Sequence, residues 1–497
     1  MRNCLALLAI AVSISPVCAQ TEADYLKPIL EDEILAPQVA VFQLRQYILH
    51  RVAKPPAPAS AVQWTADSAR LRRHLLDDVV FHGWPREWVE AAPKFEEAGV
   101  IEGAGYRIRK LRYDIVPGFQ SVALLYEPAN LQGKVPAILN VNGHVGPPGK
   151  SVEYKQKRCI TFARHGILAL NLEWLSFGEL NHNGNQHAFG HHLDLVGANG
   201  VGLFYLAMRK GLDYLYEHPN TDRDRIGMTG LSGGGWQTIV LSSLDERVKA
   251  TAPVAGYSSI ISRVEAREYG DLGDFEQSAT DMFDGMDFTH LTALMAPRPT
   301  LLIYNAEDDC CFRAAMTKPF VFDAIQPVFG LYGKTGLLNW HENRDPGTHN
   351  YQLDNRNAAY RFFSSQFKLP AFEEDADTAP EIKTYEELRA GLPENNLTIL
   401  DLARKMAGLP GRALGSNSTA LEAERVKLKS IVRLPPVHID RVWTVAISKH
   451  LGIESKSHLF SMDDGLSATG AWLKPIAAST NVPVTIILDD KGKAASG

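Results

Sequence analysis

The sequence predicts an α/β protein with a mostly parallel sheet that helices cover on both faces. After residue 105, apolar runs of strand length alternate with stretches long enough for crossover helices. The first two strands of this region alternate apolar and polar residues, which is typical of antiparallel strands. A later strand runs through a glycine-flanked serine directly into a helix. The 497 residues are 45% hydrophobic and 22% charged, which is ordinary globular composition.

The strands and helices are expected in a regular order within residues 105–372, the predicted catalytic domain. Two antiparallel strands, at 106–113 and 122–126, flank the turn Pro117-Gly118. The continuous apolar runs that predict buried parallel strands lie at 135–141, 167–172, 225–231, 248–254, 299–304 and 337–340. Helices are expected at 151–165 and 199–218, from the serine to 244, and at 360–367.

The N-terminal residues differ in composition from the rest of the chain. Residues 1–19 contain Arg2, an apolar run and small residues up to Ala19, which resembles a secretory signal peptide too short to anchor the protein in a membrane. We therefore expect a periplasmic or secreted protein without a membrane anchor. Residues 20–104 are expected to form an N-terminal helical segment, and residues 373–445 a linker with helices. The net charge of −6 and the lack of a Lys/Arg run argue against a nucleic-acid partner.

The C-terminal residues resemble the start of the catalytic domain. Three matching pairs share an offset of 347 residues: Gly118 and Gly465, Pro128 and Pro475, and Pro136 and Pro483. This ungapped match of turn, strand end and strand start predicts that residues 446–497 begin a second, truncated copy of this domain. On this interpretation the chain is a fragment of a longer protein; the alternative is chance similarity between strand-turn-strand patterns.

The serine turn has the form Gly230-x-Ser232-x-Gly234 between the predicted strand and helix. In this motif the sharp turn exposes the serine hydroxyl above the sheet, and close neighbours favour glycine on both sides. The backbone N–H groups that follow open a helix and can bind an anion. We therefore interpret Ser232 as a nucleophile; the alternative is a serine without function in a glycine-rich turn.

Residues of about 105–370 resemble the α/β-hydrolase family, and more narrowly its acetyl xylan esterase and dienelactone-hydrolase-like branch. Four segments carry the resemblance in the family's order: Gly143–Gly146, Gly230–Trp236, the Asp308 region and Gly347–His349. The resemblance implies the α/β-hydrolase fold and the chain order serine, acid, histidine for the catalytic triad.

The acid and the base of this triad are expected on two loops after predicted strands. The family spacing points to Asp308 as the acid, with Asp309 as the alternative, and Glu307 is expected to face solvent. The task of the acid would be to orient the imidazole of the base and to stabilise the charged form of that ring. His349 is the candidate base because it lies between the last strand and the closing helix, and His341 is the competing histidine.

Two further functions are assigned to the loops around Ser232. The oxyanion hole is expected to use the backbone N–H of Gly233 and a second donor at His144 or Val145. Trp174 and Trp236 are candidates for stacking on a sugar ring, although tryptophans are more often packing residues.

No cofactor or metal is expected from the sequence. His182, His187, His191 and His192 lie close together, but their spacing matches no zinc pattern, so substrate-loop or surface positions are favoured. Cys159, Cys310 and Cys311 remain after the predicted cleavage, and an odd number with one adjacent pair predicts no disulfide framework.

These observations predict a serine esterase that acts on a small-molecule or polysaccharide ester, with acetylated xylan implied by the resemblance. The first alternative is a peptidase of the prolyl-oligopeptidase type, but the roughly 85 residues between the predicted cleavage site and the sheet are too few for a propeller with blades of about 40–45 residues. The second is an inactive hydrolase-like binding module. The residues do not determine the acyl group or the oligomeric state.

Overall fold

The computed structural model describes residues 21–266, 274–374, 377–408, 417–433, 436–489 and 492–496. The chain divides into two compact units, one formed by Val52–Ala413 and the other by Met1–Arg51 together with Leu414–Gly497. Residues 1–19, the predicted signal peptide, lie outside the described residues. In the described part of the chain, every helix is too short or too polar to cross a membrane.

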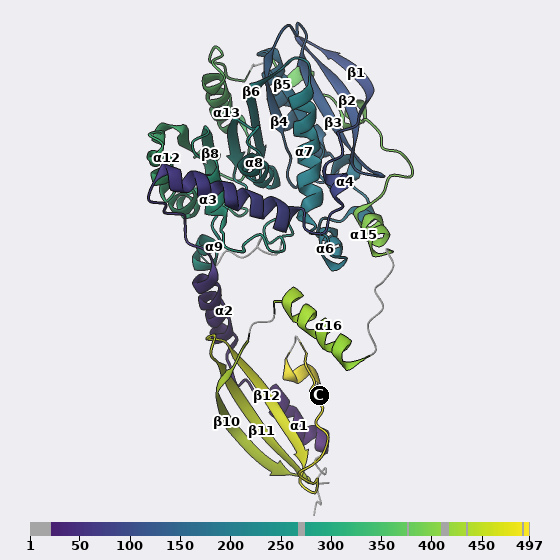
Figure 1. The fold of residues 1–497 in the computed structure, drawn as a ribbon, viewed down its shortest axis with the longest axis vertical. Helices are drawn as coiled ribbons and strands as arrows, with labels where there is room; N and C mark the ends of the chain where they lie inside the picture. The colour runs from purple at the N-terminus through teal and green to yellow at the C-terminus, as the bar shows by residue number, and fades with distance from the viewer. Residues whose placement is uncertain are drawn as a thin grey trace, which may run out of the picture. The chain divides into compact units, whose positions relative to one another are not determined.

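The larger unit is built on a sheet whose described strands have the order β1-β2-β3-β5-β4-β6-β7-β8-β9 (Figure 1). The strands are β1 (Phe95–Gly103), β2 (Tyr106–Val116), β3 (Phe119–Pro128), β4 (Val135–Asn140), β5 (Leu168–Leu172), β6 (Thr221–Leu231), β7 (Ala250–Val254), β8 (Thr300–Asn305) and β9 (Leu338–Asn343). The pairs from β1 to β3, and β3 with β5, are antiparallel, and all other neighbours are parallel. This confirms the predicted fold class.

The first strand, β1, lies in the segment that was expected to be helical before residue 105. Its sequence carries Glu96, Glu97 and Glu102 without regular alternation of apolar residues, and its side chains are mostly exposed or half-buried. An edge strand of this kind needs little apolar surface because only one of its sides pairs with the sheet. Apolar alternation therefore could not reveal it.

Helices cover both faces of this sheet. Tyr113 of β2 donates its hydroxyl to Ala207 O in α7 (Val201–Glu217), at 3.3 Å. Tyr106 of the same strand lies under the guanidinium of Arg164, at the end of α5 (Glu153–Arg164). Because Tyr106 and Tyr113 are an odd number of positions apart, they point to opposite faces of the strand, and so α5 and α7 lie on opposite faces of the sheet.

Two more helices complete these layers. The Phe162 ring of α5 packs against Tyr360 and Phe363 of α13 (Leu353–Gln366), at centroid distances of 5.1 and 5.9 Å. On the other face α7 contacts α8 (Gly233–Leu244), the helix that follows β6. The other α-helices of this unit are α3 (Ala61–His74), α4 (Arg86–Val89), α6 (Gly190–Leu195), α9 (Ile260–Ala266), α10 (Phe288–Leu294), α11 (Ala314–Lys318), α12 (Gln326–Leu331), α14 (Tyr385–Leu388) and α15 (Ile399–Ala407).

A buried ion pair joins three loops near the carboxyl ends of the strands. The Lys150 ammonium lies 3.3 Å from a Glu173 carboxylate oxygen and also contacts Glu179, and all three side chains are buried. Glu179 in turn accepts the backbone N–H groups of Ala390 and Gly391. The start of the expected linker at 373–445 therefore packs on the larger unit, because it satisfies a buried carboxylate there.

The smaller unit contains a separate antiparallel sheet and helices from both ends of the chain. Its strands are β10 (Ile439–His450), β11 (Ile453–Met462) and β12 (Ser467–Pro475), and its helices are α1 (Glu22–Glu31), α2 (Pro37–Arg51) and α16 (Ser418–Ile431). Tyr25 of α1 lies 3.3 Å from the Ser455 hydroxyl and packs edge-on against His450. The segment expected at 20–104 is thus divided between the two units after residue 51.

The small sheet has the same strand order, direction and register as β1, β2 and β3. Tyr106 pairs with Pro128 in the large sheet, and Ile453 pairs with Pro475 in the small one. Both residues of the second pair lie 347 positions after their counterparts. The bulge at residue 98 of β1 recurs at residue 445 of β10, with the same shift. The match in sequence therefore extends to backbone pairing, including an irregularity that no generic hairpin requires.

Candidate active site

Ser232 lies at the sharp turn between β6 and α8, which we call the elbow; β6 is the elbow strand. Its backbone has φ 59° and ψ −124°, a strained conformation that non-glycine residues rarely adopt. The turn is held because the Ser232 N–H donates to Val254 O of β7 at 2.9 Å, and Trp236 N–H donates to Ser232 O at 2.9 Å. The serine side chain is therefore fixed at the carboxyl edge of the sheet by the strands beside it.

The glycines around Ser232 are required by close contacts. A β-carbon on Gly230 would lie 2.4 Å from Val141 O, and one on Gly234 would lie 2.6 Å from the same oxygen. A β-carbon on Gly233 would lie 2.1 Å from the Trp174 ring. Because α8 begins at Gly233, its first N–H groups have no partner within the helix and can bind an oxyanion.

Asp308 follows β8 and is held by five hydrogen-bond donors. One carboxylate oxygen accepts the backbone N–H groups of Cys310, Cys311 and Phe312 at 3.0–3.3 Å. The other oxygen accepts the Asn305 amide at 3.2 Å and the His349 ring nitrogen Nδ1 at 2.8 Å. Burial favours the neutral acid, but these donors and the charge of His349 outweigh it and lower the pKa of Asp308 to about 2.

His349 is oriented by Asp308, so that its second nitrogen is free to act as a base. Nδ1 contacts the carboxylate, while Nε2 is buried and has no hydrogen-bond partner among the described residues. The loop that carries His349 is tied to the elbow strand, because the Tyr351 hydroxyl lies 2.7 Å from the Thr229 hydroxyl of β6. The loop and the nucleophile strand are therefore anchored to each other.

The competing residues occupy other places. His341 contacts Asp354 at the start of α13, at 2.9 Å, instead of approaching Asp308. Asp309 is exposed, and its carboxylate accepts the backbone N–H of His349, at 2.9 Å. Glu307 is exposed, as expected. Of these side chains, Asp308 is the one that contacts the His349 ring.

A network of buried asparagines supports the acid and the base, and sequence reasoning missed it. The Asn350 amide donates to Asn305 and Asn343 at 3.2 and 3.0 Å, and the Asn355 amide donates to Asn305 at 2.9 Å. Asn305 also donates to Asp308, so the network links the end of β8 to the loop of His349. The sequence carries little signal for it: Asn305 directly follows the predicted strand 299–304, but Asn350 and Asn355 lie in the predicted loop before the helix 360–367.

The predicted oxyanion loop after β4 lies against the elbow. A β-carbon on Gly143 would lie 2.7 Å from Leu231 O and 2.9 Å from Gly233 N. Asn142 anchors the loop, since its amide donates to Asn171 at 2.8 Å and its carbonyl accepts the Gln237 amide at 2.5 Å. His144 and Val145, the candidate donors, therefore follow a residue in contact with the nucleophile turn.

Replacing Gly143 with alanine is expected to lower kcat while leaving the fold intact. The added methyl group would displace the loop from Gly233 and misalign one oxyanion donor, and loss of one such donor costs about 10²–10³-fold in kcat. Steady-state kinetics with p-nitrophenyl acetate measure the effect. Gly336→Ala is the control, because no atom lies within 4 Å of the added carbon there. Equal kcat in both variants would contradict this assignment.

The two tryptophans proposed as sugar contacts have different environments. Trp174 lies against Gly233 with 2% of its surface exposed, so it borders the elbow. Trp236 is fully buried within α8, which leaves its ring inaccessible to a sugar in this structure. Trp236 was a candidate because of its place near the edge of the sheet where Ser232 lies, but its side chain is buried. Packing is therefore the role that the structure gives to Trp236.

Comparisons with known proteins match parts of this chain to esterases and to a candidate hydrolase. Residues 89–275 match the family model described as acetyl xylan esterase. The candidate hydrolase YtaP of Bacillus subtilis is 24% identical over 212 residues, which cover 40% of this chain and 70% of that protein. The solved structure of methylesterase BT1017 is 23% identical, covers 79% of this chain and 81% of its own, and has a TM-score of 0.56. A candidate acetyl xylan esterase of Bacteroides fragilis is 17% identical, with coverage of 61% and 81% and a TM-score of 0.50.

Proposed function

We propose that the hydrolase unit, a carboxylic ester hydrolase of the acetyl xylan esterase type with an α/β-hydrolase fold, forms its acyl-enzyme on Ser232. The observation that carries this proposal is the geometry of three loops at one edge of the sheet. Ser232 occupies a strained elbow, and Asp308 contacts a His349 ring whose second nitrogen has no hydrogen-bond partner in the described part of the chain. Strain at an elbow serine is typical of a nucleophile held above the sheet.

The reaction follows from these groups. His349 Nε2 accepts the proton of the Ser232 hydroxyl as its oxygen attacks the acyl carbon, and Asp308 stabilises the imidazolium that forms. The backbone N–H of Gly233, with that of His144 or Val145, donates to the developing oxyanion. The imidazolium then gives its proton to the leaving alcohol. A water molecule, deprotonated by His349, hydrolyses the acyl-enzyme and releases the carboxylic acid.

We propose an acetylated carbohydrate as the substrate, on the strength of the family match at residues 89–275. The test measures acetate release from acetylated xylan oligosaccharides, methanol release from a methyl uronate, and cleavage of a dipeptide anilide. Acetate release supports the proposal. Methanol release alone would instead indicate a methyl ester as the substrate, the class that the name of methylesterase BT1017 gives. Anilide cleavage alone would instead favour the peptidase alternative, and no reaction with any of them or with a fluorophosphonate would favour the inactive module.

The pH dependence of hydrolysis is expected to follow the protonation of His349. Burial disfavours the charged ring, but the hydrogen bond and charge of Asp308 outweigh this effect and raise the pKa of His349 above its ordinary value of 6.5. Only the neutral ring can accept the serine proton, so kcat/KM should fall as the pH decreases through a value above 6.5. A pH profile with p-nitrophenyl acetate tests this. Activity that stays constant well below pH 6.5 would contradict it.

We also propose that the sheet β10–β12 is the start of a second hydrolase-like repeat and that residues 1–19 direct export. The shared register and bulge at an offset of 347 support the first proposal. An experimental structure in which β10–β12 lack this register would overturn it.

For the proposal that residues 1–19 direct export, N-terminal sequencing of the exported protein should find cleavage near Ala19.

A further inference from the structure

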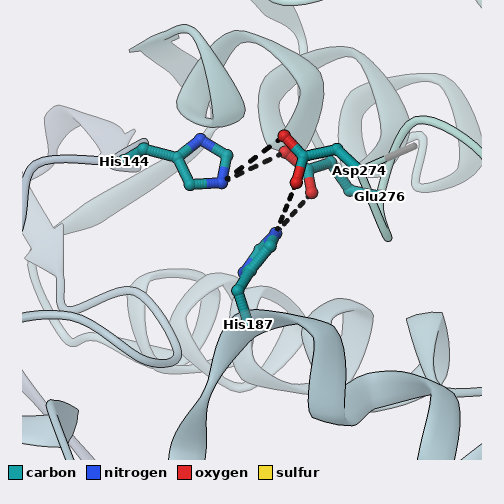
Figure 2. A group of neighbouring side chains, drawn as sticks. All are labelled: His144, His187, Asp274 and Glu276. Carbon is teal, nitrogen blue, oxygen red and sulfur yellow. Dashed lines mark hydrogen bonds and ion pairs between the residues drawn. The ribbon is translucent and has the colours of Figure 1, made fainter. Parts of the chain in front are cut away.

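Four side chains with metal-ligating atoms meet beside the candidate active site. His144 follows β4, His187 begins a short 3₁₀ turn after β5, and Asp274 and Glu276 lie after α9. One ligand atom from each residue lies within 4.8 Å of the other three. Figure 2 shows both imidazoles directed toward the two carboxylates, which they approach from different loops. We call these residues the His/Asp/Glu cluster.

The distances in the cluster are close to those of a tetrahedral metal site. His144 Nε2 lies 3.8 Å from Asp274 and 3.7 Å from Glu276, and His187 Nε2 lies 3.9 Å from Asp274. With metal–ligand bonds of about 2.0–2.1 Å, the ligand atoms of a tetrahedral zinc site lie about 3.4 Å apart. The three distances are therefore slightly long, and the shorter His187–Glu276 contact of 2.5 Å would have to open.

The charges in the cluster also favour a bound cation. The Glu276 side chain is 2% exposed. Among the described residues, its ion-pair partners are the two imidazoles, and no lysine or arginine faces it. A buried carboxylate needs a positive partner, and Asp274 adds a second negative charge beside it. One divalent cation would offset both carboxylates at once.

The donor set selects the class of ion. Two imidazole nitrogens and two carboxylate oxygens suit zinc and neighbouring first-row divalent ions. Calcium prefers six to eight oxygens and magnesium retains several waters, so neither matches this set. The four residues are spread from position 144 to 276, which explains why spacing along the sequence could not predict the site.

We propose that the His/Asp/Glu cluster binds one divalent transition-metal ion of the zinc class. The site would be separated from the nucleophile elbow by one aromatic ring. Trp174 packs against His144 and His187 at centroid distances of 4.7 and 5.1 Å, and its ring also lies against Gly233. The ion would thus hold the segment of Asp274 and Glu276 against the loop of His144, the candidate oxyanion loop, and the loop of His187.

Zinc binding to the EDTA-treated full chain tests this proposal. Isothermal titration calorimetry with zinc chloride should show one ion per chain. Glu276→Gln keeps the side-chain volume but removes a ligand charge, so we expect the Kd to rise more than the 10–100-fold that is typical for loss of a partner outside the coordination shell. His187→Gln should weaken binding similarly. Bound Co²⁺ should also show visible absorption typical of tetrahedral coordination, and this absorption should be lost in both variants.

A matched control separates the cluster from other histidine–carboxylate pairs. His341→Gln removes a histidine that pairs with Asp354 at 2.9 Å outside the cluster, and it should bind zinc as the unmodified chain does. Circular dichroism in EDTA verifies that each variant is folded. If the unmodified chain binds no zinc, or if folded Glu276→Gln and His187→Gln both bind it with unchanged Kd, the cluster is a hydrogen-bonded network and the proposal is wrong.

Discussion

Ser232→Ala is expected to lower kcat for ester hydrolysis by about 10⁶-fold, the effect typical of a removed catalytic serine. Without the hydroxyl no acyl-enzyme can form, although the oxyanion hole and substrate binding remain. The elbow itself should persist, because Ser232 is held there by backbone hydrogen bonds to Val254 and Trp236. The residual rate with p-nitrophenyl acetate, after subtraction of the spontaneous reaction, measures this loss.

Covalent labelling provides a second measurement of the same prediction. A fluorophosphonate should add to the unmodified chain, as seen in its intact mass, and should not add to Ser232→Ala. Ser242→Ala is the matched control, because Ser242 lies in α8 and its hydroxyl contacts Thr251 instead of the site. Labelling or turnover that survives in Ser232→Ala would place the nucleophile elsewhere.

Asp308→Asn is expected to reduce kcat by about 10⁴-fold while leaving the geometry of the site intact. Three backbone N–H groups point at one oxygen of Asp308, so the asparagine carbonyl should take that position. Its NH₂ group then faces His349 Nδ1, which must accept a hydrogen bond. The ring proton is thereby moved to Nε2, which can no longer take the serine proton.

Asp309→Asn distinguishes the two candidate acids. The Asp309 carboxylate accepts the backbone N–H of His349, and an asparagine oxygen can accept the same bond. We therefore expect a small change in kcat, without a change in the pH profile. A loss in Asp309→Asn as large as that in Asp308→Asn would contradict the assignment of Asp308. Thermal unfolding of both variants separates loss of activity from loss of structure.

Local patterns explain how much of the fold could be predicted. The parallel strands were identified because a strand buried on both faces is a continuous apolar run, as β4 and β8 are. The elbow was identified because its backbone geometry demands glycine at fixed positions around Ser232. By contrast, β1 was missed, since an exposed edge strand has no apolar period, and Trp236 was placed at the site although it packs inside.

The α/β fold, the elbow at Ser232 and the order of the candidate acid and base could be predicted because each depends on residues close together in the chain. The three-dimensional structure was needed to show that Asp308 contacts the His349 ring, whereas Asp309 contacts the His349 backbone N–H. It also decided that His144 and His187 face Asp274 and Glu276. These contacts join loops from different strands, and their distances depend on how the sheet brings the strand ends together, which no local pattern records.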